Sequence, residues 1–184
     1  MLRIIIVFVI LNFYNPALTS MKEDIISKMQ ITNNLSFNFI QTVDEKSESG
    51  MCILEYPQKI YCEYDGANKK TIISNGKSLV IKTNNNNNYY IYPLNRTPLK
   101  YILDKEYLIT KIKILEPRNI DNKYLNFQIF ENNNEINVFF DKKNLNLIGW
   151  QTEDIYQNLS VTFISSVKIN QKIDEEKFKL PQNN

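Results

Sequence analysis

Two cysteines, Cys52 and Cys62, are the residues whose type and spacing most directly suggest chemistry. They are equidistant from Pro57, so a tight hairpin at that proline would place them opposite each other on two antiparallel strands. Cross-strand Cβ distances of about 4.5–5.5 Å approach the geometry of a disulfide. In an oxidising compartment we expect a disulfide. Two buried thiols that act as small apolar residues are the alternative.

The rest of the chain offers little support for catalysis. It contains no histidine, so a cysteine would lack the base that activates a catalytic thiol, and two cysteines alone make a poor zinc site. The sequence has no nucleophile elbow and no phosphate-binding loop. Five carboxylates fall at expected turns or helix ends and are interpreted as solvated: Asp104, Glu106, Asp174, Glu175 and Glu176. We therefore predict a binding protein without catalytic residues, metal or cofactor. An extracytoplasmic hydrolase is a distant alternative.

The first twenty residues have the pattern of a secretory signal peptide. Arg3 is followed by a short apolar run over residues 4–11, and residues 16–20 supply a break and small side chains. The apolar run is about half of the ~20 residues that a membrane-spanning helix needs, which disfavours an anchor. We predict a signal peptide at residues 1–20, one domain at residues 21–184, and an oxidising extracytoplasmic location. The net charge of +2 does not suggest nucleic-acid binding.

Residues 50–94 alternate short β-branched or aromatic runs with turn signals, which is typical of an antiparallel meander. Alternation in the first hairpin places two sets of side chains on one face: Cys52, Leu54 and Tyr56, and opposite them Ile60, Cys62 and Tyr64. Asn75-Gly76 predicts a two-residue turn that pairs Ile72 with Leu79. The meander therefore has a continuous apolar face.

Helical and strand patterns flank this meander. Residues 22–32 predict an amphipathic helix, and residues 97–103 predict a short helix with Thr97 as its N-cap. We interpret residues 107–115 as a strand. Further strands are expected at residues 35–43, 124–130, 136–141, 145–151 and 158–167. About ten or eleven strands and two or three short helices favour one all-β barrel or strongly curved sheet.

These motifs together resemble the LolA family, the periplasmic lipoprotein carriers of the Lol system. The matching residues follow the family's order: Phe39, Gln41, Gly50, Pro57, Tyr64, Ile73, Asn75, Gly76, Lys77, Leu79, Leu94, Thr97, Pro98, Lys177, Phe178 and Pro181. The similarity spans nearly the whole chain after residue 20. It implies a single incomplete, unclosed antiparallel β-barrel whose short helices form a lid over a hydrophobic interior.

The resemblance also implies a function and a set of site residues. The protein would be a soluble, monomeric periplasmic carrier that receives acylated lipoproteins from an inner-membrane ABC transporter and delivers them to an outer-membrane acceptor. The lipid cavity would be lined by Phe37, Phe39, Leu54, Tyr56, Ile60, Tyr64, Leu79 and Ile81. The lid would be formed by Ile25, Ile26, Met29, Pro98, Leu99, Ile102 and Leu103.

Two features leave alternatives open. Tyr56 stands where well-known family members have an arginine that helps to latch the lid, and a tyrosine cannot make a forked, charged contact.

The same scaffold could also carry another amphiphile, such as a glycolipid or a phospholipid, or serve as a non-catalytic sensor or interaction module. Alternation alone does not decide which face of the sheet lines a cavity.

Overall fold

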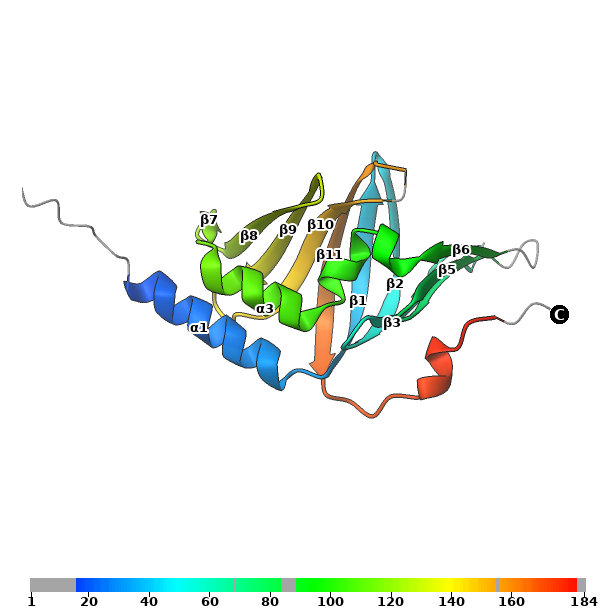
Figure 1. Ribbon diagram of the computed structural model, residues 1–184, viewed down its shortest axis with the longest axis horizontal. Helices are drawn as coiled ribbons and strands as arrows, with labels where there is room; N and C mark the ends of the chain where they lie inside the picture. The colour runs from blue at the N-terminus through cyan, green and yellow to red at the C-terminus, as the bar shows by residue number, and fades with distance from the viewer. Residues whose placement is uncertain (1–15, 68, 84–88, 155, 182–184) are drawn as a thin grey trace, which may run out of the picture.

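The computed structural model describes residues 16–67, 69–83, 89–154 and 156–181 (Figure 1). Its body is one antiparallel sheet of eleven strands in the order β6-β5-β4-β3-β2-β1-β11-β10-β9-β8-β7. The strands are β1 (Asn34–Val43), β2 (Lys46–Glu55), β3 (Lys59–Tyr64), β4 (Thr71–Asn75), β5 (Ser78–Lys82), β6 (Tyr89–Pro93), β7 (Arg118–Ile120), β8 (Tyr124–Glu131), β9 (Asn134–Asp141), β10 (Leu147–Glu153) and β11 (Leu159–Ile169). The sheet is unclosed, which confirms the expected incomplete barrel.

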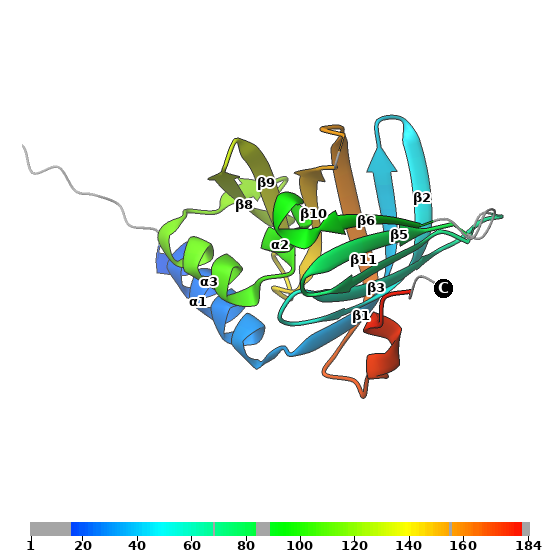
Figure 2. The same ribbon diagram turned by 45° about the vertical axis from the view of Figure 1, so that its right-hand side comes forward.

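The helices lie on the concave side of this sheet. They are α1 (Pro16–Ile31), η1 (Leu94–Arg96), α2 (Leu99–Ile102) and α3 (Lys105–Ile114), while the short 3₁₀ turn η2 (Glu175–Phe178) belongs to the C-terminal tail. The segment η1–α2–α3 connects edge strand β6 to edge strand β7, so it runs along the side that the sheet leaves open. Figure 2 shows the sheet curving around α2, with α1 and α3 packed side by side.

The predicted strand at residues 107–115 is wrong, because this segment forms helix α3. Asp104 caps the helix, and its carboxylate accepts a hydrogen bond from the Tyr107 backbone N–H at 3.0 Å. Leu108 and Ile112 lie one turn apart and are fully buried, so burial of one helical face outweighs the β-branched composition. Thr97 is not the N-cap of α2; its hydroxyl donates to the Leu94 carbonyl at 2.9 Å, and α2 begins at Leu99.

The helix predicted for residues 22–32 is confirmed, but the observed helix α1 begins earlier than predicted, at Pro16. The predicted signal peptide at residues 1–20 lies mostly outside the described residues, and residues 16–20 form the first part of α1. Among the described residues, no helix combines the length and apolar character needed to span a membrane.

The strand registers decide which side chains share a face. Cys52 pairs with Cys62 and Leu54 with Ile60, as the sequence predicts. In the second hairpin Ile72 pairs with Ile81, so that register differs from the prediction by two residues. The Asn75 side-chain carbonyl accepts from the backbone N–H groups of Lys77 and Ser78, which makes Gly76 and Lys77 the connecting residues. A two-residue shift leaves each side chain on its predicted face.

The core lies between the concave face of the sheet and helices α1, α2 and α3. Its largest fully buried side chains are Phe127, Phe140, Ile25, Leu54, Leu94, Ile102, Leu103, Leu108, Ile112, Leu125, Ile129 and Ile136. Phe127 and Phe140 meet edge to face with ring centroids 5.8 Å apart. The helices therefore form part of the hydrophobic core.

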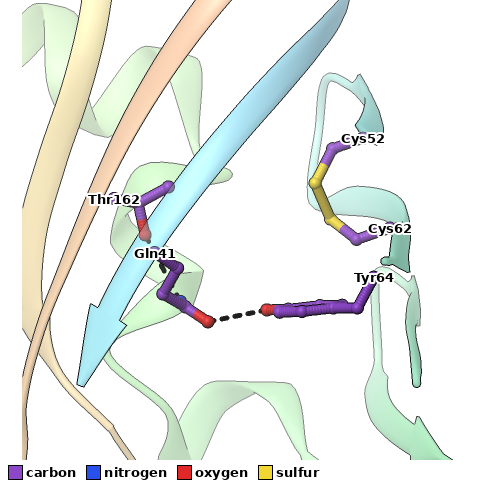
Figure 3. The surroundings of a disulfide bond; sticks show 5 residues. All are labelled: Gln41, Cys52, Cys62, Tyr64 and Thr162. Atoms are coloured by element: carbon purple, nitrogen blue, oxygen red, sulfur yellow. Dashed lines mark hydrogen bonds between the residues drawn. A yellow bond between two sulfur atoms is a disulfide. The ribbon is translucent and has the colours of Figure 1, made fainter. Parts of the chain in front are cut away.

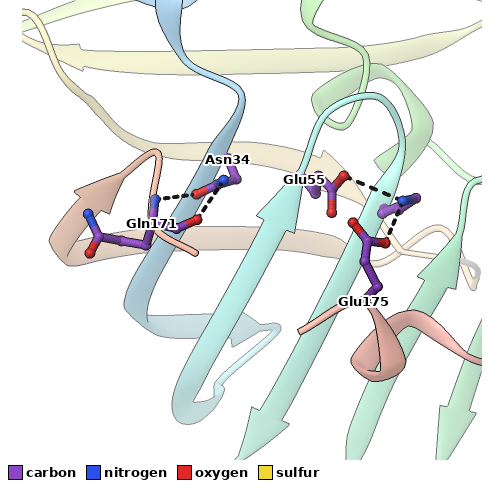
Figure 4. A network of polar contacts seen from close by, with 5 residues as sticks. Asn34, Glu55, Gln171 and Glu175 are labelled. Atoms are coloured by element: carbon purple, nitrogen blue, oxygen red, sulfur yellow. Dashed lines mark hydrogen bonds and ion pairs between the residues drawn. The ribbon is translucent and has the colours of Figure 1, made fainter. Parts of the chain in front are cut away.

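The C-terminal tail contacts β3 and β4 through η2, away from the concave core. Phe178 is buried, and the Lys59 ammonium lies 5.5 Å from its ring centroid. Figure 4 shows the carboxylates of Glu55 and Glu175 converging from β2 and η2, and Lys59 pairs with both. The tail thus contains one short helical turn, and the described residues after that turn form no strand.

Candidate functional site

A pocket of about 260 Å³ lies between the concave face of the sheet and α2. One of its walls is apolar and comes from inward-facing positions of β2 to β5: Cys52, Ile60, Cys62, Ile72, Leu79 and Ile81. Pro98 and Leu99 of the lid segment also line it. This volume falls just below the roughly 300–1,000 Å³ of pockets that enclose drug-sized ligands. The pocket is therefore too small to enclose several acyl chains at once.

The predicted cavity residues divide into three groups. Phe39, Ile60, Tyr64, Leu79 and Ile81 line the pocket. Phe37 and Leu54 lie in the packed core, where their side chains are 3% and 0% exposed. Tyr56 lines a separate pocket of about 50 Å³, together with Met29 of α1.

The predicted lid residues show a similar division. Pro98 and Leu99 face the pocket. Ile25, Ile102 and Leu103 are fully buried in the core, and Ile26 and Met29 are half-buried against it. Most of the predicted lid residues thus fill the interior with their own side chains.

Backbone hydrogen bonds tie the predicted lid helices, α1 and α2, to the turn between β2 and β3. The Gln58 N–H donates to the Leu103 carbonyl at 2.8 Å, at the end of α2. The Gln58 carbonyl in turn accepts from the buried Ser74 hydroxyl at 2.9 Å. The Tyr56 N–H donates to the Asn33 carbonyl at 2.9 Å, which joins the same turn to the junction of α1 and β1.

The Tyr56 side chain adds packing to this attachment. Its ring lies 5.8 Å from the Lys105 ammonium, which donates to the Gln30 and Thr32 carbonyls at the end of α1. Burial, with a smaller contribution from Asp104, raises the pKa of the Tyr56 hydroxyl well above its ordinary value. Tyr56 is therefore neutral at physiological pH.

Cys52 and Cys62 form a disulfide on the pocket wall, with their Cα atoms 4.1 Å apart (Figure 3). Both residues are buried. The bond joins β2 to β3 beside Tyr64. Because both strands contribute to the apolar wall, the disulfide fixes their relative position in that wall.

The opposite side of the pocket carries Phe39, Val43 and Trp150 and, beside them, four polar residues: Gln41 on β1, Thr152 on β10, and Ser160 and Thr162 on β11. We call these four residues the polar wall. The Gln41 amide nitrogen donates to the Ser160 hydroxyl at 3.1 Å and to the Thr162 hydroxyl at 3.3 Å. The Tyr64 hydroxyl donates to the Gln41 carbonyl oxygen at 2.7 Å, so the two side chains meet across the concave face (Figure 3).

Gly50 on β2 makes that contact possible. It lies between Phe39 and Tyr64 in the strand registers, and the two rings approach to 4.8 Å over it. A Cβ at this position would lie 2.1 Å from the Glu63 carbonyl oxygen and 2.9 Å from the Phe39 ring. Only glycine therefore allows Tyr64 to reach Gln41 across β2.

Charged groups gather at the edge of the pocket. Glu48, Glu153 and Asp154 contribute carboxylates, and Lys70 contributes an ammonium that pairs with Glu48. The Lys70 ammonium also lies 3.8 Å from the Tyr64 ring centroid. Burial raises the pKa of the Tyr64 hydroxyl well above its ordinary value, so Tyr64 acts as a neutral hydrogen-bond donor.

Sequence reasoning missed the polar wall. The signal was present, because Gln41 continues the inward alternation of Phe37 and Phe39, and Ser160 and Thr162 precede the inward Ile164. Within the described residues, no group of three or more histidine, cysteine, aspartate or glutamate side chains could hold a metal ion.

Comparison with known proteins identifies one matching family model. The model is described as outer membrane lipoprotein carrier protein LolA, and it matches residues 30–181. No curated protein matches the chain.

Solved structures share the fold at very low sequence identity. A conserved protein of uncharacterised function from Thermus thermophilus has a TM-score of 0.52 at 7% identity, covering 90% of this chain and 95% of that one. A domain from Vibrio parahaemolyticus, provisionally assigned to outer membrane lipoprotein sorting, has a TM-score of 0.51 at 6% identity, with coverages of 86% and 94%. A LolA superfamily protein from Nitrosomonas europaea has a TM-score of 0.48 at 8% identity, with coverages of 89% and 97%.

Proposed function

Because the chain belongs to the family of outer membrane lipoprotein carrier proteins, LolA, we propose that it is a periplasmic, non-catalytic carrier of lipoprotein acyl chains. The observation that carries this proposal is an apolar pocket whose lid is built from core residues. Leu99 borders the pocket, and the adjoining Ile102 and Leu103 are completely buried. Movement of one short segment would therefore enlarge the apolar space.

The binding free energy then depends on an exchange. Each buried CH₂ contributes about 0.8 kcal/mol, so acyl chains entering an empty cavity would bind too tightly to be released. Here Leu99, Ile102 and Leu103 already occupy the interior, and incoming chains displace them. The net affinity is the difference between two apolar fillings, and it can be small enough for transfer.

This exchange requires the lid to detach from the β2–β3 turn. The backbone bond from Gln58 to Leu103 and the packing of Tyr56 oppose detachment. In the cell we assign the opening of the lid during loading to an inner-membrane ABC transporter and the unloading to an outer-membrane acceptor, whereas a lipopeptide supplied in excess displaces the lid without a transporter. In this proposal a signal peptide at residues 1–20 directs export, and residues 21–184 act as a monomer.

The test is binding of a triacylated lipopeptide, measured by intact mass spectrometry under native and then denaturing conditions. The unaltered protein should retain the lipopeptide, whereas Leu99→Asn should lose it while keeping the β-sheet circular dichroism spectrum. Lys100→Asn is the matched control, because Lys100 is the next residue of α2 and does not line the pocket. Failure of the unaltered protein to bind any lipopeptide would refute the carrier function. Preference for a phospholipid or glycolipid would refute lipoproteins as the cargo.

A further inference from the structure

We propose that the polar wall is a recognition site for the ester carbonyl groups of an uncharged acylated glycerol. This inference rests on the carrier function proposed above and specifies the chemical class of its cargo. It concerns the four residues of the polar wall, which face the apolar wall across one pocket. An acyl chain joined to glycerol through an ester would fit both walls, because its hydrocarbon suits the apolar wall and its ester carbonyl can accept hydrogen bonds from the polar wall.

The hydrogen bonds of Gln41 determine what the polar wall offers to a ligand. Its amide nitrogen donates to the oxygens of both Ser160 and Thr162. Each hydroxyl has one hydrogen and two acceptor lone pairs. Because each oxygen accepts from Gln41, each hydroxyl hydrogen must point away from Gln41. Because Ser160 and Thr162 line the pocket, these hydrogens are free to be donated to a ligand there.

Gln41 is itself held in this orientation. The Tyr64 hydroxyl donates to its carbonyl oxygen at 2.7 Å, which leaves the amide nitrogen directed at β11 (Figure 3). Tyr64 is fixed in turn by edge-to-face packing on Phe39. Gln41 is thus a positioning residue, and the hydroxyls are the groups that would contact the ligand.

Burial distinguishes this wall from an ordinary solvated surface. Thr152, Ser160 and Thr162 are only 6%, 6% and 3% exposed. Buried polar groups in a sheet that otherwise packs an apolar core cost stability unless they are hydrogen-bonded. A ligand carbonyl would satisfy the hydroxyl donors once the pocket is filled.

The charged residues around the pocket indicate that the part of the ligand bound at the polar wall is uncharged. Among the described residues that line the pocket, the carboxylates of Glu48, Glu153 and Asp154 outnumber the ammonium of Lys70. Lys70 is already paired with Glu48. A phosphate headgroup would therefore meet net negative charge, whereas an ester carbonyl needs only donors.

The experiment compares two lipopeptides of equal chain length, one with ester-linked and one with ether-linked chains on the glycerol. The ether probe keeps the hydrocarbon and the peptide and lacks only the ester carbonyl oxygens. Their affinities would be measured for the unaltered protein and for the double variant Ser160→Ala/Thr162→Val. The control is Thr42→Val/Ser47→Ala, which removes an exposed pair of bonded hydroxyls outside the pocket. A second variant, Thr152→Val, leaves the hydrogen bonds of Gln41 intact.

We expect the unaltered protein and the control to bind the ester probe about tenfold more tightly than the ether probe. Ser160→Ala/Thr162→Val should remove most of that preference, Thr152→Val should reduce it, and phosphatidylglycerol should bind more weakly than the ester probe. Equal binding of both probes by the unaltered protein would overturn the inference while leaving the carrier function standing. A preference that survives in both variants would also overturn it. Failure of both probes to bind would instead refute the carrier function itself.

Discussion

Reduction of the Cys52–Cys62 disulfide should lower the stability of the protein by an amount that its loop length determines. The bond joins residues ten positions apart. For a loop of about ten residues, the chain-entropy relation gives a loss of about 9 cal/mol/K, or about 2.7 kcal/mol at 25 °C. In a chain of this size that corresponds to a fall in Tm of about 5–10 °C.

The assay is thermal unfolding followed by circular dichroism, with and without a reductant. The reduced protein keeps both sulfur atoms in place, so its difference from the oxidised protein isolates the cross-link. Cys52→Ala/Cys62→Ala should unfold near the temperature of the reduced protein and should not respond to the reductant. Any difference in Tm between this variant and the reduced protein measures the contribution of the two buried sulfur atoms to packing beside the pocket.

A shift in Tm of less than about 2 °C on reduction would refute this reasoning. Such a result would mean that the unfolded chain already holds the β2–β3 hairpin together, so that the cross-link removes little entropy. A much larger shift would indicate that the disulfide also holds the pocket wall in the folded protein.

Three further perturbations test other parts of the structure. Gly50→Ala should lower the free energy of unfolding by at least about 2 kcal/mol, measured by urea denaturation, since the new Cβ would overlap the Glu63 carbonyl oxygen; an unchanged midpoint would contradict the packing of Tyr64 over β2. Tyr56→Ala should speed the release of bound lipopeptide while the β-sheet circular dichroism spectrum stays unchanged; unaltered release would show that Tyr56 does not hold the lid. The hydrogen bond from Lys59 lowers the pKa of Glu175 from its ordinary 4.5, so this contact stabilises the tail at neutral pH and is lost as the pH falls through that lowered value. NMR signals of the Lys59 side chain should therefore shift at acid pH in the unaltered protein and in Glu176→Gln, and should shift less in Glu175→Gln, where Glu55 is the remaining partner; an equal shift in Glu175→Gln would assign it to another group.

Alternation predicted the faces of the strands well, because a half-buried strand must place every second side chain inside. It also predicted the pairing of Cys52 with Cys62 around Pro57. It misread residues 107–115, where isoleucine and threonine favour a strand but the cap at Asp104 and the spacing of Leu108 and Ile112 require a helix.

The distinction between core and pocket could not be read from the sequence. Phe37 and Phe39 have the same residue type and the same face, yet only Phe39 lines the pocket. The difference depends on what packs against each position in the folded protein, which the pattern of a single strand does not contain. Alternation also points Gln41, Ser160 and Thr162 inward, but only the pairing of β1 with β11 brings these three side chains together.

The central position of that strand pair has a consequence for the order of folding. β1 is the first strand of the chain and β11 the last, and they are neighbours in the middle of the sheet. Strands β1 to β6 can form a meander from local contacts alone, and so can β7 to β11. The two halves become one sheet only when the last strand pairs with the first, which requires closure of nearly the whole chain. Ser160 and Thr162 therefore join Gln41 and the apolar wall late, after β11 itself has been synthesised.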